Sequence, residues 1–276
     1  MSAVLTVKDL HVLFLHEGKS LPIVSDINFS VRRGQCLGIL GESGSGKSMT
    51  CKAVLGLLDK NFEIRGSARF ENRELLLESA ENLRRLRGSK ICTVLQNPMS
   101  CFDPLFRIGE QMEETLVEHT PLRRTALREK CLEILNLMRI NNPQEVLRKY
   151  PHQLSGGMLQ RVMIGLAVGL EPDLIIADEP TTAIDSISQH SIMQEFMRIK
   201  QTGKTSMIFI SHDLGVLSYI ADEVLVMHRG KVVEQGSPEH VFDHASDPYT
   251  RHLIAQHKAV MRKFLRAIHP AREAMA

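Results

Sequence analysis

The alternation of apolar and polar residues divides the chain into strand-like and helix-like stretches. Within residues 4–33, β-branched and apolar residues cluster between turn signals at 17–19 and 33–34, which predicts short antiparallel strands. Further along, short apolar runs alternate with helix-patterned stretches at 49–58 and 186–200, an order that predicts a parallel sheet. We expect core strands at 36–40, 91–95, 173–177 and 205–210, and a closing hairpin of 224–227 and 232–233 around 229–230.

The pattern changes between residues 98 and 170, where strand signals vanish and helical spacing dominates. Four segments there carry apolar residues three and four positions apart: 108–118, 122–138, 144–149 and 157–170. This predicts a helical subdomain at 98–170 inserted into an α/β core. The core then comprises 1–97 and 171–245, and a helical tail follows at 246–276.

The tail after Pro248 is basic as well as helix-prone. We favour an ordinary terminal helix that packs on its own domain, and a helix that docks on a membrane surface or a partner is the alternative. The histidines near the C-terminus do not share one helix face, so solvated side chains are favoured over a regulatory metal site. They are His240, His244, His252, His257 and His269.

Composition and charge exclude several classes of function. Hydrophobic residues make up 43% of the 276 residues, enough for a large buried core. The 34 basic and 32 acidic residues leave a net charge of +2, so a dedicated nucleic-acid surface is not expected. The five cysteines form no C-x-x-C pair and indicate a reducing compartment.

The sequence also bears on the membrane. The first residues lack a basic segment followed by an apolar one, so we expect no signal peptide. No apolar run approaches the roughly 18 residues that cross a bilayer. Membrane association is therefore expected through a partner.

Residues 41–48, called the phosphate loop below, have the spacing G-x-x-x-x-G-K-[ST] directly after an apolar strand. Glycine-rich backbone at this spacing curls around a triphosphate, with N–H groups of the following helix pointing at the anion. Lys47 is expected to reach the β- and γ-phosphates, and the Ser48 hydroxyl to bind Mg²⁺. The nucleotide-binding residues predicted here are Gly41, Ser43, Gly44, Ser45, Gly46, Lys47, Ser48 and Met49.

Two adjacent acids, Asp178 and Glu179, end the apolar strand 173–177. Their place at the carboxyl edge of a parallel sheet suits Asp178 to the Mg²⁺ shell and Glu179 to a base that polarises water. Taken alone, the pair is also consistent with an ordinary exit from strand to loop.

Leu154, Ser155, Gly156 and Gly157, called the signature segment below, precede a helix. Ser155 suits the helix N-cap, and the glycines allow close approach of another molecule. A simple capped helix start is the alternative. Because one chain has one phosphate loop, a second phosphate-facing element makes most sense across a dimer interface.

These motifs, together with Gln96, Asp185 and His212, occur in the order and spacing of ABC transporter nucleotide-binding subunits, which this chain resembles over about residues 4–240. The signature segment distinguishes that family from other P-loop NTPases. The resemblance implies an α/β fold: a P-loop NTPase (RecA-like) core with an N-terminal antiparallel β-subdomain and an inserted helical subdomain. It implies ATP and Mg²⁺ as cofactors.

The resemblance also implies roles on the chain's own side of the nucleotide. Lys47 and Ser48 would bind the phosphates and Mg²⁺, and Asp178 would belong to the metal shell. Gln96 would sense the metal and the lytic water, and Glu179 would be the catalytic base.

Other implied roles concern the nucleotide of an opposing subunit and the transition state. Ser155, Gly156 and Gly157 would clamp the γ-phosphate that the opposite subunit holds, and Asp185 would lie in a loop that crosses the interface. His212, after the strand 205–210, would contact the γ-phosphate and stabilise the transition state.

Such proteins stack an aromatic residue from their N-terminal strands on adenine. Phe14 is the candidate here and Phe29 the weaker one, and both are core residues if neither stacks.

Several segments resemble the peptide- and nickel-importer subgroup, among them 150–152, 181–185 and 247–250, while 44–51 and 96–98 are most similar to its nickel and metallophore members. Peptide-transporting relatives often carry a cysteine-rich C-terminal extension, whereas this chain has no cysteine after Cys131. An importer of nickel or metal chelates is therefore favoured over an importer of oligopeptides or dipeptides.

The resemblance implies an ATP-hydrolysing subunit that is peripheral to the cytoplasmic face of the inner membrane. Its partners would be a second ABC ATPase subunit, two transmembrane permease subunits and, indirectly, an extracytoplasmic solute-binding protein, with no nucleic acid. A permease helix is expected beside Pro98, Phe102, Leu105 and Phe106, which could equally be subdomain core.

Two other classes of P-loop protein fit the sequence less well. A soluble ABC ATPase acting on DNA or ribosomes would need a long coiled coil or a second ATPase domain. A small-molecule P-loop kinase would lack the signature segment.

Overall fold

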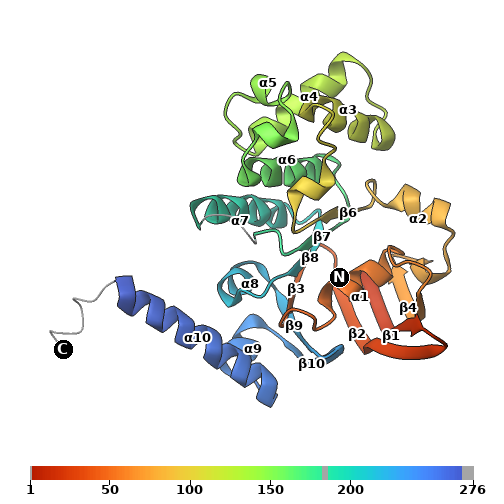
Figure 1. The fold of residues 1–276 in the computed structure, drawn as a ribbon, viewed down its shortest axis with the longest axis vertical. Helices are drawn as coiled ribbons and strands as arrows, with labels where there is room; N and C mark the ends of the chain where they lie inside the picture. Colours follow the sequence, from red (N-terminus) through yellow and green to blue (C-terminus); the bar gives the residue numbers. More distant parts are fainter. Residues whose placement is uncertain (1, 182–185, 269–276) are drawn as a thin grey trace.

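The structure is a computed structural model that describes residues 2–181 and 186–268. Its backbone forms two sheets, a group of helices at one end and a long C-terminal helix (Figure 1). The first sheet is antiparallel, with strand order β2-β1-β4-β5. Its strands are β1 (Ala3–His16), β2 (Lys19–Arg32), β4 (Phe62–Phe70) and β5 (Arg73–Glu74).

The predicted short strands of residues 4–33 are in fact two long ones, β1 and β2. Their ladder is interrupted by register shifts, and Asp9 and Asp26 have positive φ angles of 48° and 55°. Each interruption breaks the two-residue alternation of apolar and polar positions, so one bulged strand resembles several short ones in the sequence.

The second sheet has the strand order β10-β9-β3-β8-β7-β6. All neighbours in it are parallel except β9 and β10, which form the predicted hairpin. The strands are β3 (Cys36–Leu40), β6 (Ile91–Val94), β7 (Leu174–Asp178), β8 (Ser206–Ile210), β9 (Glu223–His228) and β10 (Lys231–Gly236). Parallel order brings the carboxyl ends of β3, β6, β7 and β8 to one edge, where ligands bind in open α/β sheets.

The helices occupy the remaining sequence. The first pair is α1 (Lys47–Val54) and α2 (Ala80–Leu86). The helical end comprises α3 (Ile108–His119), α4 (Thr125–Leu137), α5 (Pro143–Val146) and α6 (Gly156–Gly169). Then follow α7 (Ser186–Gln201), α8 (Leu214–Ile220), α9 (Pro238–Asp243) and α10 (Pro248–Ile268). Short 3-10 turns, η1 (Leu75–Leu77), η2 (Pro98–Cys101) and η3 (Pro151–Gln153), connect some of these elements.

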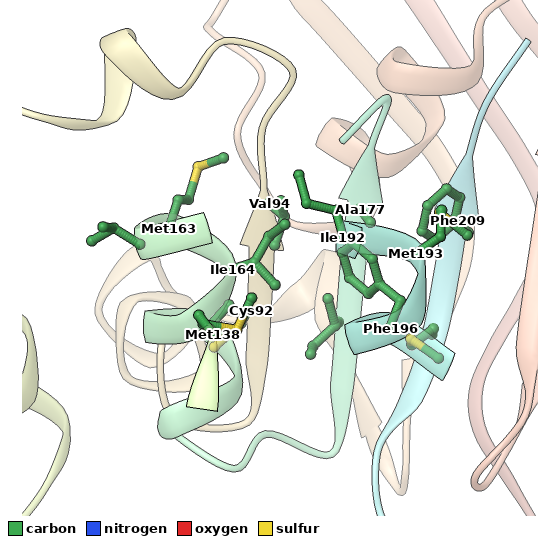
Figure 2. Close-up of a cluster of buried hydrophobic side chains, with 14 of the residues drawn as sticks. Cys92, Val94, Met138, Met163, Ile164, Ala177, Ile192, Met193, Phe196 and Phe209 are labelled. Atoms are coloured by element: carbon green, nitrogen blue, oxygen red, sulfur yellow. The ribbon is translucent and has the colours of Figure 1, made fainter. Parts of the chain in front are cut away.

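Two apolar clusters hold these layers together, and β7 contributes to both. Ile175 and Ala177 pack toward the helical side, whereas Leu174 and Ile176 pack toward α1 and the antiparallel sheet. Figure 2 shows the first cluster, in which Phe196 of α7 lies edge-on to Phe209 of β8 with ring centroids 5.1 Å apart. Alternate residues of one buried strand therefore anchor opposite faces of the sheet.

These arrangements confirm the predicted fold class, an α/β P-loop core with an antiparallel β-subdomain and inserted helices. None of the helices within the described residues is long and apolar enough to span a membrane.

Candidate active site

The phosphate loop connects the end of β3 to the start of α1 and is held by buried contacts. Gly41 has a φ of 156°, and a Cβ there would clash with the Met227 carbonyl oxygen and with Ser45 Oγ. Gly46 has a φ of 104°, in the left-handed region that favours glycine. The β9–β10 turn supports the loop from outside, since the Gly230 N–H donates to the Ser45 carbonyl at 3.0 Å.

Lys47 is buried inside this loop. Its Nζ donates to the carbonyl oxygens of Gly41 and Glu42, each at 2.8 Å. Burial lowers the pKa of Lys47, and the nearby carboxylates of Glu179 and Asp178 oppose that shift. An anion placed against the ammonium would favour its charged form.

Ser48 and Asp178 meet between the loop and the end of β7. Ser48 Oγ donates to Asp178 Oδ1 at 2.9 Å. Burial raises the pKa of Asp178, and the Ser48 hydrogen bond partly offsets this effect. A hydroxyl and a carboxylate oxygen side by side are the hard ligands that Mg²⁺ prefers.

Glu179 follows in a strained backbone conformation, with a φ of 46°. Its N–H donates to the Ile210 carbonyl at 3.0 Å, which ties it to the end of β8. Glu179 Oε2 accepts from Gln96 Nε2 at 3.1 Å and lies 3.5 Å from His212 Nδ1. Residues after three neighbouring strands, β6, β7 and β8, thus meet at one carboxylate.

The residues around the loop fit a nucleotide and a divalent cation. Within the described residues, the buried Ser45 Oγ has no hydrogen-bond partner. Lys47, Ser48 and Asp178 add an ammonium, a hydroxyl and a carboxylate beside it, the donor set that a magnesium–phosphate group requires.

The signature segment lies apart from this site. Ser155 caps α6, accepting from the Met158 N–H at 3.3 Å, and both Ser155 and Gly156 are exposed. A Cβ on Gly156 would meet no described atom within 4 Å. Figure 1 shows α6 among the helices and α1 beside the antiparallel sheet, so one chain presents the two elements at different places.

The remaining sequence candidates are placed as follows. Phe14 is half-buried and its ring lies 5.2 Å from that of Phe62. Phe29 is buried in the core between the sheets, which removes it as a stacking surface. Met49 packs against the same core, and Ser43 is exposed. Asp185 lies outside the described residues.

The predicted docking residues divide into two groups. Phe102 is buried in the helical cluster, in agreement with the subdomain-core alternative. Leu105 and Phe106 are 78% and 52% exposed, which leaves apolar surface just after η2.

The C-terminal histidines within residues 186–268 do not form a cluster, and His269 lies outside the described residues. His240 pairs with Glu234, and His252 with Gln256. Among the described residues, no group of three or more His, Cys, Asp or Glu side chains could hold a metal ion.

Sequence reasoning missed two residues at the edge of the site. Gln160 of α6 is buried and its Nε2 donates to the Leu95 carbonyl at 3.4 Å, next to Gln96. The Tyr249 hydroxyl of α10 accepts from the N–H of Glu42 at 3.4 Å. Tyr249 lies in the segment 247–250, which resembles the importer subgroup, and Gln160 follows the signature segment, but only tertiary packing reveals their contacts.

Comparison with known proteins identifies the family. The ABC transporter family matches residues 24–182. The chain is 42% identical over 260 residues to the metal-staphylopine import system ATP-binding protein CntD of Staphylococcus aureus (strain NCTC 8325 / PS 47), covering 94% of this chain and 95% of that protein. It is 41% identical over 252 residues to the oligopeptide transport ATP-binding protein OppD of Lactococcus lactis subsp. cremoris (strain SK11), covering 91% and 75%.

The fold has solved counterparts as well. An ATP-binding cassette solved as a dimer in a post-hydrolysis state, bound to ADP and Pi, matches with a TM-score of 0.75 and 25% identity, covering 85% of this chain and 98% of that one. With a family match over more than half of its length and relatives above 40% identity, the chain belongs to the ABC transporter family and is one of its ATPases.

Proposed function

We propose that this chain powers uptake of nickel or other metal chelates, as the ATP-hydrolysing subunit of an importer. The observation that carries the catalytic part is the convergence of Gln96 and His212 on Glu179 beside the phosphate loop. The relative that imports metal-staphylopine supports the cargo class.

The phosphate loop is the binding element in this proposal. The Lys47 ammonium has three N–H donors, of which two hold carbonyls of its own loop, so the third can meet a phosphate oxygen. Ser48 and Asp178 would hold Mg²⁺, which neutralises charge that develops on the phosphates. Backbone N–H groups of the loop and of the start of α1 complete the anion site.

Glu179 is proposed as the base. Its carboxylate would accept the proton of the attacking water, and Gln96 would orient that water by its amide. The exposed imidazole of His212 would contact the γ-phosphate and stabilise the transition state. The contacts with Gln96 and His212 hold the Glu179 side chain in place.

The site is completed by a second ABC ATPase subunit in this proposal. The exposed Ser155 and Gly156, with the half-buried Gly157, would meet the nucleotide held by that partner, at the positively polarised end of α6. Asp185 would lie in the same interface. The dimeric form of the solved cassette supports such an assembly.

Two transmembrane permease subunits are the further partners. The exposed Leu105 and Phe106, just after η2, offer apolar contact for a permease helix. The chain would thereby sit peripherally on the cytoplasmic face of the membrane, and an extracytoplasmic solute-binding protein would deliver the cargo.

The cargo proposal has one competitor, uptake of oligopeptides or dipeptides, which the oligopeptide-transport relative supports. Cells that lack this chain should be tested for uptake of radioactive nickel with and without a metallophore, and for growth on peptides as the sole source of a required amino acid. Complementation with the chain should restore nickel uptake, and Glu179→Gln should not. Restoration of peptide-dependent growth alone would overturn the metal assignment.

A further inference from the structure

The C-terminal helix α10 begins next to the phosphate loop. Its second residue, Tyr249, accepts the N–H of Glu42 at 3.4 Å. Residues 42 and 249 are separated by 207 positions, so this contact joins distant parts of the chain.

Tyr249 acts on the same peptide group that holds Lys47. The N–H of Glu42 and the carbonyl of Gly41 belong to one planar unit, in which they point in opposite directions. That carbonyl accepts from Lys47 Nζ at 2.8 Å. Tyr249 and Lys47 therefore hydrogen-bond to opposite sides of one peptide plane. Loss of either hydrogen bond leaves this peptide freer to rotate.

One ring contact and the fixed start of α10 set the position of the Tyr249 phenol. The His228 ring, at the end of β9, stacks on Tyr249 with ring centroids 3.7 Å apart and planes inclined by 28°. Before the helix, the carboxylate of Glu234 accepts from the N–H groups of Ser246 and Asp247 at 2.6 and 3.3 Å. The phenol thus extends from a fixed helix start.

The protonation state of the phenol suits this role. Burial raises the pKa of Tyr249. The hydrogen bond from the Glu42 N–H opposes this shift, and the negative charge of Glu42 adds to it. The hydroxyl therefore keeps its proton at neutral pH and stays a neutral acceptor.

We infer that Tyr249 is a positioning residue for ATP: by fixing the Gly41–Glu42 peptide, it sets the carbonyl that orients Lys47 toward the phosphates. This inference rests on ATP binding at the phosphate loop. Because the loop touches the phosphates in both the ground state and the transition state, loss of the hydroxyl weakens both to the same extent.

The test compares Tyr249→Phe, Tyr249→Ala and a matched control, Tyr219→Phe, in the full chain. Tyr219 is half-exposed on α8, so its hydroxyl serves as a control for the chemical change. Calorimetric titration with Mg·ATP and steady-state ATPase kinetics are measured for each, together with the melting temperature without nucleotide.

Tyr249→Phe should raise the Kd and KM for ATP about three- to tenfold, the range of one hydrogen bond. Its kcat and melting temperature should stay near wild type, because the ring still stacks on His228. Tyr249→Ala should add a loss of thermal stability, and Tyr219→Phe should match wild type in all three readouts.

Wild-type Kd and KM in Tyr249→Phe would overturn the inference, even if Tyr249→Ala is defective, because only ring packing would then matter. A fall in kcat at unchanged KM would overturn it as well. If wild type and Lys47→Ala both fail to bind Mg·ATP, the proposed ATP site and the inference about Tyr249 are both wrong. If wild type binds Mg·ATP and Lys47→Ala does not, the ATP site stands, and the result for Tyr249→Phe alone decides the inference.

Discussion

Gln96 Nε2 donates to Glu179 Oε2 at 3.1 Å, although 83 positions separate the two residues along the chain. The contact exists because β6 and β7 are parallel neighbours with Val94 opposite Ala177, so the residues that follow each strand emerge at the same edge. A glutamine that leads into η2 and the helical end is thereby attached to the carboxylate proposed as the base. Movement of the helical end relative to the sheet would change this contact.

The first prediction concerns Glu179→Gln. Removing the carboxylate should lower kcat by about a hundredfold or more, because general-base catalysis contributes on that scale. The amide is nearly isosteric, so ATP binding should persist and the variant should accumulate as an ATP-bound dimer. Single-turnover hydrolysis and light scattering with Mg·ATP measure the two effects.

The matched control is Glu171→Gln. Glu171 is exposed and shares the left-handed backbone, with a φ of 51° against 46° for Glu179. It should hydrolyse ATP at the wild-type rate. Hydrolysis by Glu179→Gln at that same rate would remove Glu179 from the role of base.

Much of the fold follows from local pattern. The predicted strand 36–40 is β3 to the residue, and the predicted helix 186–200 differs from α7 only at its end. Buried parallel strands produce unbroken apolar runs, which sequence reveals clearly. The bulged strands β1 and β2 were misjudged because their alternation is broken, and 144–149 forms only α5, which is shorter.

The site was predictable as a set of residues but not as a set of contacts. Motif spacing indicated Lys47 and Asp178, yet nothing local placed Gln160 against the Leu95 carbonyl or Tyr249 against Glu42. Such contacts depend on how distant helices pack, which the sequence of each helix does not specify. The roles assigned to the site residues stay predictions.

The second prediction uses the pKa of Asp178, which burial raises above its ordinary 3.8. The native chain therefore binds this proton more tightly than the unfolded chain does. Between the ordinary pKa and the raised one, stability falls as the pH rises, and the full cost of the buried charge is present above the raised pKa.

Asp178→Asn should accordingly increase the melting temperature of the nucleotide-free chain at pH 7.5, while Mg²⁺-dependent hydrolysis falls about a hundredfold or more. The gain should shrink as the pH is lowered toward 4. The exposed Asp9, changed to Asn, should alter neither quantity. A lower melting temperature for Asp178→Asn at pH 7.5 would contradict the burial argument.

The third prediction concerns thiol reactivity. All five cysteines lie in the described part of the chain as free thiols, and Cys101 alone among them is exposed. Burial raises the pKa of Cys92 and Cys131 to about 12, and raises that of Cys36 and Cys51 further. Only thiolates react with iodoacetamide, so these four should stay unlabelled in the native chain.

Cys101 should label, but slowly at pH 7, because partial burial raises its pKa as well. Its rate should rise about tenfold per pH unit below that pKa. Mass spectrometry should find one modified site in native buffer and five in urea. Fast modification of any second cysteine under native conditions would show that the core opens more readily than its packing indicates.

The last prediction separates folding from assembly through Gly156→Asp. A Cβ at Gly156 meets no described atom within 4 Å, and a carboxylate in the first turn of α6 should stabilise the helix by about 0.3–1 kcal/mol. The variant should therefore melt no lower than wild type and bind ATP at its own loop. Its hydrolysis should nevertheless fall about a hundredfold, because the new charge repels the phosphates that a second subunit presents.

The control is Gly18→Asp, at a hairpin turn with a φ of 73° and equally open surroundings. It should show the reverse, with stability lower by about 1 kcal/mol and hydrolysis unchanged. Wild-type hydrolysis in Gly156→Asp would mean that the signature segment faces no nucleotide, and the shared site would have to be abandoned.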